Sequence, residues 1–266
     1  MRAAFLALSV LVLLPNPLLA AGLAAHEALY ELSVGRVKYG AATESGSGQF
    51  LLRVQRRCDG WLLVTRMDFD IVSAGGREIQ MESSSSVEES LDGRSMRFTQ
   101  ESRINGEIVD ELVGRAVLPP ADSGATGRVL FDKPEGVRLD LPPETMFPIS
   151  ATAWSIEEYR KGRKVVSYMI FDGGSADGPY VLSDVVTGDL QPLEELPQGD
   201  TALLAGIGWR VIASFFKFGA ADAEPLFTQS GEIYENGVIT KATLDLGVLE
   251  AEARLARLRA LPAPSC

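Results

Sequence analysis

Few residue types in this chain of 266 residues could carry nucleophilic or metal chemistry. It contains two cysteines, Cys58 and Cys266, and a single histidine, His26. A Ser-His-Asp or Cys-His arrangement would have to use that histidine close to the start of the mature chain, where termini fray. A structural zinc site needs four Cys or His ligands, and the chain has three such residues. Motifs for nucleotide binding, for a serine nucleophile elbow and for metalloproteases are absent. We therefore predict no catalytic residue, no metal site and no cofactor.

Carboxylates are the one abundant reactive group, because 36 Asp and Glu residues give the chain a net charge of −11. Two acids that converge in a cleft could hydrolyse an envelope polymer, which makes a carboxylate-dependent hydrolase the alternative function. In so acidic a chain, however, adjacent acids such as those of VDEL and PLEEL are expected on solvated faces. The same charge argues against nucleic acid and anionic membrane surfaces as partners.

Residues 1–25 have the pattern of a signal peptide. Arg2 precedes an unbroken apolar run over 3–14, Pro15 ends the run, and small residues follow up to residue 25. The run is shorter than the roughly 20 residues that a membrane span needs. No cysteine lies near the cleavage region to accept a lipid anchor, and no later apolar run is long enough to span a bilayer. We predict an exported chain with one β-rich domain over 26–266.

In an exported chain, an even number of cysteines favours a disulfide over free thiols, although two free thiols stay open as the alternative. Cys58 stands before an Asp-Gly turn, and Cys266 is the last residue. A bond between them would enclose 266 − 58 − 1 = 207 residues. The chain-entropy model assigns such a loop roughly 5 kcal/mol of stabilisation. The two thiols are therefore placed to close the fold.

The elements that surround these residues show mainly the period of two of antiparallel strands. Along 61–71, one face carries Trp61, Leu63, Met67, Phe69 and Ile71, and the other carries Arg66, Asp68 and Asp70. Turn dipeptides recur after roughly every dozen residues and predict hairpins: Gly75-Gly76, Asp92-Gly93, Asn105-Gly106, Asn236-Gly237 and Asp172-Gly173. The serine run 83–86 reads as an exposed strand face.

Two segments show helical spacing. Ile149, Ala153 and Ile156 follow one face, with Ser150 as the predicted N-cap and Gly162 as the stop. The segment 248–262 has acids early and arginines late, which suits a helix dipole, so we predict a second helix there. Residues 197–216 are ambiguous between a short helix and a strand.

Eight short sequences, spread from one end of the mature chain to the other, carry a resemblance to a known family. They are HEALYELSV, CDGW, EESLDGRSMRF, RINGEI, LPPETMFPIS, FDGG, YENGV and the terminal LPAPSC. In this order they resemble the EipB-type cell-envelope integrity proteins of alphaproteobacteria. The chain departs from the family pattern at Val87, where an aromatic residue is common, and in lacking a histidine after the FP dipeptide.

The resemblance implies a periplasmic protein whose long antiparallel sheet forms a spiral, an incomplete barrel with a trough. It also implies a disulfide between the CDGW cysteine and the terminal one, here Cys58 and Cys266. The molecular activity of the family is not established. We therefore expect a non-enzymatic protein that supports cell-envelope integrity by binding an envelope protein, a peptide or a lipid-like ligand in the trough.

The expected trough has an inner wall, and the predicted helix has an apolar face that must be buried against some surface. We assign the wall to Trp61, Leu63, Met67 and Phe69. Pro142 and Pro143 force the chain out of the sheet before the helix begins. Phe147 and Trp154 border the apolar face of the helix. We predict that this helix packs across the concave face, either as a plug that a ligand displaces or as a permanent core helix.

Overall fold

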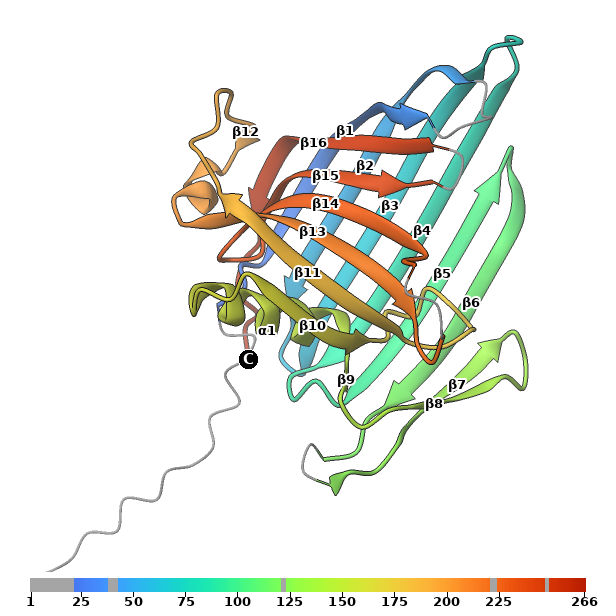
Figure 1. Cartoon of the computed structure of the whole chain (residues 1–266), viewed down its shortest axis with the longest axis vertical. Helices are drawn as coiled ribbons and strands as arrows, with labels where there is room; N and C mark the ends of the chain where they lie inside the picture. Colours follow the sequence, from blue (N-terminus) through green and yellow to red (C-terminus); the bar gives the residue numbers. More distant parts are fainter. Residues whose placement is uncertain (1–21, 38–42, 121–122, 221–223, 247–248) are drawn as a thin grey trace, which may run out of the picture.

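Strands dominate the computed structural model in Figure 1, which describes residues 22–37, 43–120, 123–220, 224–246 and 249–266. Most of the predicted signal peptide, residues 1–21, lies outside the described residues. The first strands are β1 (His26–Val37), β2 (Thr43–Arg56), β3 (Gly60–Ser73), β4 (Glu78–Ser90), β5 (Ser95–Ile104), β6 (Glu107–Val117), β7 (Gly127–Lys133) and β8 (Arg138–Leu141). After them come β9 (Thr145–Met146), α1 (Pro148–Arg160), β10 (Val165–Ile170), β11 (Tyr180–Asp189), β12 (Gln198–Gly199), β13 (Gly208–Lys217), β14 (Phe227–Tyr234), β15 (Ile239–Asp245) and β16 (Leu249–Ala260).

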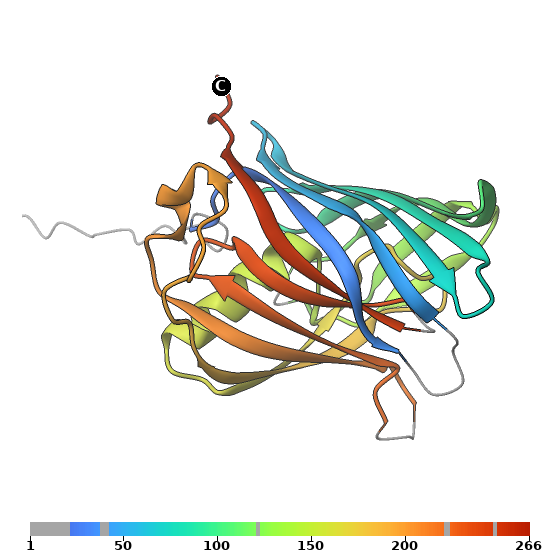
Figure 2. The ribbon, with the colours of Figure 1, turned by 90° about the horizontal axis from the view of Figure 1, so that it is seen from above.

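All these strands belong to one sheet, which curls into a barrel with one open seam. Its order is β8-β7-β6-β5-β4-β3-β2-β1-β16-β15-β14-β13-β11-β10-β9, with β12 beside β16. The first and last strands pair with each other, so the chain runs outward from β1 to β8 and returns from β9 to β16 (Figure 2). The seam separates β8 from β9, which are consecutive in the chain. Pro142 and Pro143 lie in the link between them and have no N–H to donate to a ladder.

The predicted period of two is confirmed along β3. Met67, Phe69 and Ile71 are buried, whereas Arg66, Asp68 and Asp70 are exposed. Four of the predicted turns join neighbouring strands, with positive φ at Gly76, Gly93, Asn105, Gly106 and Gly237. The serine run 83–86 lies within β4, as predicted, but only Ser84 is exposed and the other three serines are half-buried. Asp172-Gly173 belongs instead to the longer link between β10 and β11.

The predicted helix over 248–262 is wrong, because Leu249–Ala260 forms the strand β16. Leu249, Ala251, Ala253 and Leu255 are buried at every second position, a period that the alanines conceal in the sequence. β16 pairs with β1 on one side and with β15 on the other, and these ladders satisfy its backbone on both edges. Tertiary pairing thus overrides local helix preference. The ambiguous segment resolves into a 3-10 helix, Thr201–Leu204, followed by β13.

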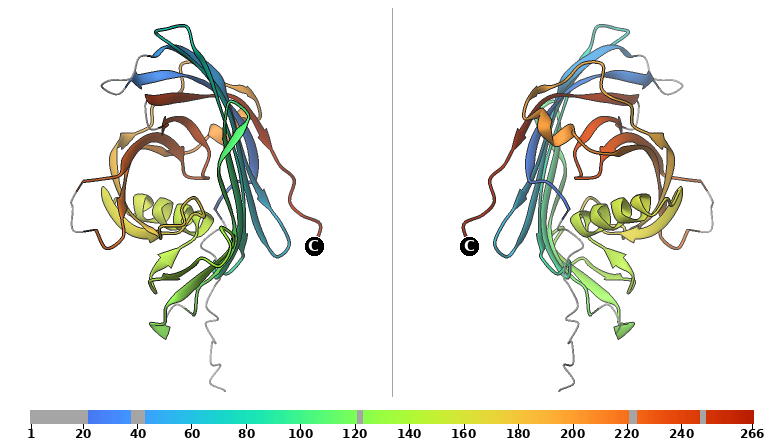
Figure 3. Two further views of the ribbon diagram at one scale, coloured as in Figure 1. Left: turned by 90° about the vertical axis from the view of Figure 1, so that its right-hand side faces the viewer. Right: turned by 90° about the vertical axis from the view of Figure 1, so that its left-hand side faces the viewer.

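The helix α1 lies inside the curve of the sheet, between the wall of β10–β14 and the wall of β1–β6 (Figure 3). This confirms the predicted helix in the concave face. It begins with Pro148 at N1, where a missing N–H costs nothing, and Gly162 follows its end with φ of 83°. Ser150 is not its N-cap: Phe147 holds that position and makes no side-chain cap.

Residues 23–25, which fall within the predicted signal peptide, contact the body of the fold. Leu23 packs against the clusters around Tyr159 and Trp61. The backbone N–H of Ala24 donates to the Asn236 carbonyl at 2.8 Å, and the Leu261 N–H donates to the Ala25 carbonyl at 2.9 Å.

Candidate functional site

α1 touches both walls of the barrel, which makes it the centre of the concave face. Near its start, Ile149 packs against Trp61 of β3 and Val54 of β2. Farther along, Ala151 packs against Ile170 of β10 and Leu182 of β11. In its second half, Ile156 and Tyr159 pack with residues of the β10–β13 wall, Val166, Val186 and Trp209. The helix therefore bridges two walls of the one sheet on the side where its edges, β8 and β9, do not pair with each other.

The six predicted trough residues fall into three places. Trp61 and Leu63 lie near the start of α1, and Phe147 is in the cluster under β5–β7 to which Leu63 also belongs. Trp154 lies on the helix and meets the Tyr168 ring edge to face at 5.4 Å. Met67 and Phe69 belong to a separate cluster with β1, β15 and β16. Trp61, Met67, Phe69 and Phe147 are all buried, so Leu63 and Trp154 are the two that stay partly accessible.

A buried carboxylate of the wall, Glu89 of β4, caps the start of the helix. Glu89 accepts hydrogen bonds from the backbone N–H of Ile149 at 2.8 Å and of Ser150 at 2.9 Å, and from the Ser150 hydroxyl. An acid at this place neutralises the positive end of the helix dipole. Burial raises the pKa of Glu89 above its usual value, although the hydrogen bonds from Ser150 and Ile149 act in the opposite direction.

The sequence reasoning missed Glu89, yet one signal was present. Glu89 shares its strand face with the buried Val87 and so points toward the core. The CDGW segment lies next to Glu89 across the strand pair, with Gly60 opposite Ser90. A Cβ atom on Gly60 would clash with the Glu89 carbonyl oxygen, at a distance of 2.2 Å. The glycine of CDGW therefore permits the close approach of β3 to the strand that carries the cap.

A second buried carboxylate, Asp184 of β11, binds Tyr159 near the C-terminal end of the helix. It accepts hydrogen bonds at Oδ2 from the Tyr159 hydroxyl at 2.6 Å and the Tyr168 hydroxyl at 3.0 Å. Burial raises the pKa of Asp184. Burial and the neighbouring Asp184 raise the pKa of both tyrosines, which keeps them as hydrogen-bond donors.

These two buried acids are bound near opposite ends of α1. Glu89 contacts residue 149 and Asp184 contacts residue 159, which a helix separates by about 15 Å at 1.5 Å per residue. Paired glycosidase carboxylates lie roughly 5 to 9.5 Å apart. Each acid is instead bound to the helix or to a tyrosine beside it, so both act here as structural acceptors.

Half-buried aromatic side chains lie on the inner face of the wall beyond the helix. Tyr180 follows the same alternation as the buried Leu182. Its ring meets that of Phe215 at 5.9 Å and that of Phe227 at 6.1 Å, and the two phenylalanine rings stack at 4.3 Å. On the opposite wall, the hydroxyls of Thr65 and Ser85 are 2.8 Å apart. The concave face thus carries an aromatic cluster on one wall and a hydroxyl pair on the other.

His26 is placed differently from our expectation of a frayed terminus. It lies in β1 opposite Val54 and Ala260, and it is 1% exposed. Its Nδ1 lies 2.8 Å from the Ala24 carbonyl, and its buried Nε2 has no hydrogen-bond partner among the described residues. Burial lowers the pKa of His26 below its usual value. It is therefore a neutral core residue.

We expect His26 to make the protein less stable in mild acid. The unfolded chain takes up a proton near pH 6.5, whereas the folded protein resists it, so this stabilisation is complete above pH 6.5 and is lost as pH falls through the lowered folded pKa. The loss amounts to at most about 1.4 kcal/mol per pH unit. Urea unfolding of wild type and His26→Gln between pH 8 and 5 measures it. Equal pH slopes for both proteins would contradict the assignment.

The predicted disulfide joins Cys58, in the turn between β2 and β3, to Cys266. The Cα atoms are 5.7 Å apart and the S–S distance is 2.06 Å. The bond ties the C-terminal tail, which leaves β16 at Ala260, to the outer side of the β1–β6 wall (Figure 3). It thus clamps the last strand onto the early sheet, next to the strand pair that carries Trp61 and Glu89.

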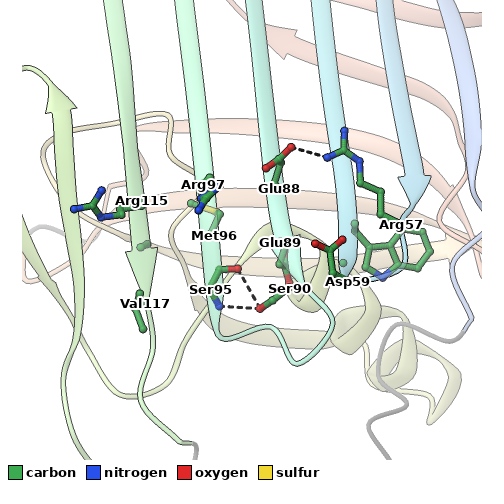
Figure 4. A pocket seen from close by; sticks show the side chains of 13 residues that line it. Arg57, Asp59, Glu88, Glu89, Ser90, Ser95, Met96, Arg97, Arg115 and Val117 are labelled. Atoms are coloured by element: carbon green, nitrogen blue, oxygen red, sulfur yellow. Dashed lines mark hydrogen bonds and ion pairs between the residues drawn. The ribbon is translucent and has the colours of Figure 1, made fainter. Parts of the chain in front are cut away.

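Beside this turn, a shallow cavity of about 380 Å³ opens on the outer face of β3–β6 (Figure 4). Arg57 donates from Nη1 to Glu88 at 2.6 Å across its upper side. Arg97 and Arg115 line it from β5 and β6, and Ser90 and Ser95 hydrogen-bond to each other below them. Sequence reasoning did not identify this cavity, because its residues come from four strands.

Taken together, a single sheet rolled into a seamed barrel around one helix defines a β-barrel-like protein. No helix among the described residues is long and apolar enough to cross a membrane. A family model described as EipB-like matches residues 18–262, so the chain belongs to the EipB-like family.

A named relative and a solved structure agree with this assignment. The cell envelope integrity protein EipB of Brucella abortus is 26% identical over 243 residues, which cover 88% of this chain and 82% of the relative. A crystal structure of a beta-barrel-like protein, a domain of unknown function from Brucella abortus, superposes with a TM-score of 0.77. It is 22% identical and covers 90% of this chain and 99% of that chain, so it supports the fold.

Proposed function

We propose that this protein supports the integrity of the cell envelope from the periplasm as a non-enzymatic binding protein. Its ligand is an elongated molecule, a partner peptide or a lipid-like chain, that enters the concave face beside α1. The proposal rests on the arrangement of the concave face. One inserted helix bridges two walls across an open seam, and partly accessible aromatic rings continue along one wall beyond it.

Part of α1 stays open to a ligand, although Glu89 and Asp184 anchor the helix near its two ends. Its apolar face is divided among three separate clusters, and Trp154 is only half-buried. Apolar concavities with a few placed polar groups are typical of ligand sites, and unpaired strand edges accept extended peptides. The relative in Brucella abortus is named for cell envelope integrity, which supports the envelope role.

Trp154 reports on the proposed ligand directly. We expect palmitate, as a lipid-like probe, or an unstructured apolar decapeptide, as a peptide probe, to change its emission, since either would alter its contact with Tyr168. A Trp61→Phe, Trp209→Phe variant isolates this signal. A saturable change with one probe identifies the ligand class. If neither probe nor periplasmic extract fractions change the emission, α1 is a permanent core helix and the binding proposal fails.

The envelope role has its own test. A strain that lacks this protein should become more sensitive to detergent, and the full chain supplied in trans should restore resistance. A chain whose leader is deleted should stay in the cytoplasm and fail to restore it. Equal resistance in all strains would contradict the envelope role, whatever the binding experiments show.

A further inference from the structure

A row of charged side chains crosses the outer face of the sheet beside the disulfide (Figure 4). The register places Glu88 of β4 directly opposite Arg97 of β5, and Arg97 directly opposite Arg115 of β6. The Glu88 carboxylate is engaged by Arg57 at 2.6 Å. Arg97 and Arg115 are both exposed, and neither has a hydrogen bond or an ion pair with any residue in the described part of the chain.

This arrangement costs energy unless an anion is present. Like charges directly opposite on neighbouring strands repel each other. The carboxylate opposite Arg97, that of Glu88, is paired with Arg57. It therefore does not neutralise the charge of Arg97 or Arg115. Beside the two arginines the cavity is lined by Ser90, Ser95 and Val117, and near Arg57 it is lined by the carboxylate of Asp59. Two uncompensated arginines are also unexpected in a chain with a net charge of −11.

We propose that Arg97 and Arg115 form a binding site for an anionic oxygen group, either a phosphate or a carboxylate. Directly opposite residues in an antiparallel pair have Cβ atoms about 4.5–5.5 Å apart, so both side chains can reach one group. Guanidinium forks bind such oxygens through paired hydrogen bonds. The adjoining cavity of about 380 Å³ has room for the molecule that carries the anion, of the size of a sugar or an amino acid.

This site is independent of the concave face. Met96 and Ala116, which alternate with Arg97 and Arg115, are buried on the inner side of the same strands. The anion site therefore lies across the sheet from the side that holds α1. If the anion site does not bind, the proposed ligand binding in the concave face is unaffected. If the concave face binds no ligand, the anion site is likewise unaffected.

Nuclear magnetic resonance of arginine Nε–Hε groups tests the site in the full mature chain. Inorganic phosphate and acetate are titrated separately, with sodium chloride keeping the ionic strength constant. We expect saturable shifts of two arginine signals, which Arg97→Gln and Arg115→Gln assign. The double variant should bind the active anion at least roughly tenfold more weakly, because two charge-assisted contacts are lost. The control is Arg66→Gln, an exposed arginine of β3 in a cavity that Asp68, Glu82 and Glu101 also line.

The outcomes separate the two sources of the anion. Saturation by phosphate alone assigns the site to phosphate-bearing molecules, and saturation by acetate alone assigns it to carboxylates. Comparable binding of both supports a site for anionic oxygens in general. The proposal is overturned if neither anion saturates the signals, or if the double variant binds as tightly as wild type and Arg66→Gln.

Discussion

Replacing both cysteines, Cys58→Ser with Cys266→Ser, should lower the free energy of unfolding by roughly 3–5 kcal/mol. The bond closes most of the chain, with a sequence separation of 208, and so restricts the unfolded ensemble strongly. The fold itself should persist, because a chain of this length buries enough apolar surface without the bond. Guanidinium unfolding followed by circular dichroism measures the loss.

Two controls accompany that measurement. Ser265→Ala alters the same tail without touching the bond and should unfold as wild type does. Wild type treated with a reductant should match the double variant. If oxidised and reduced proteins unfold at the same denaturant concentration, the bond contributes nothing and its role as a clamp is refuted.

Glu89→Ala should cost about 3–5 kcal/mol, since it leaves three donors at the start of α1 without their acceptor. Glu89→Gln should cost less, because its amide oxygen still accepts one hydrogen bond. Glu88→Ala is the matched control: it changes the next residue of β4, whose carboxylate pairs with Arg57 on the outer face. That exposed pair is worth at most about 1 kcal/mol.

The pH dependence of the Glu89 effect has a defined sign. Burial raises the folded pKa, so the folded protein keeps the proton at pH values where the unfolded chain has released it. This part of the stability is present below about pH 4.5 and is lost as pH rises through the raised folded pKa. It should vanish in Glu89→Gln. Equal stability of Glu89→Ala and Glu88→Ala at neutral pH would show that the helix needs no cap from the wall.

Much of the fold could be predicted because local rules govern it. The alternation along β3 and the turn glycines at 76, 93, 106 and 237 each depend on a few neighbouring residues. Pro142 and Pro143 mark the seam for the same reason. β16 was predicted wrongly because its period of two is carried partly by Ala251 and Ala253, which are equally at home in a helix.

The site was harder to predict because its contacts are long-range. Glu89 lies 60 residues before Ile149, and no local pattern links a strand residue to a helix start that far along the chain. Asp184 likewise meets Tyr159 only through the placement of β11 beside α1. The arginine pair depends on a register shift between Ser102 and Arg103, which places Arg97 opposite Arg115. Counting back from the Asn105-Gly106 turn alone would place Gly114 there. Four of the six predicted trough residues are buried. Trp61 and Phe147 are buried near the start of α1, and Met67 and Phe69 are buried against β1, β15 and β16.

Amide hydrogen exchange of α1 tests whether a ligand enters the concave face beside this helix. The wild-type mature protein is measured alone and with whichever of palmitate and the decapeptide saturates the Trp154 signal. We expect faster exchange over residues 148–160 in the complex, with exchange in β7 and β8 unchanged as the internal reference. Unchanged protection of α1 in the saturated complex would contradict this expectation.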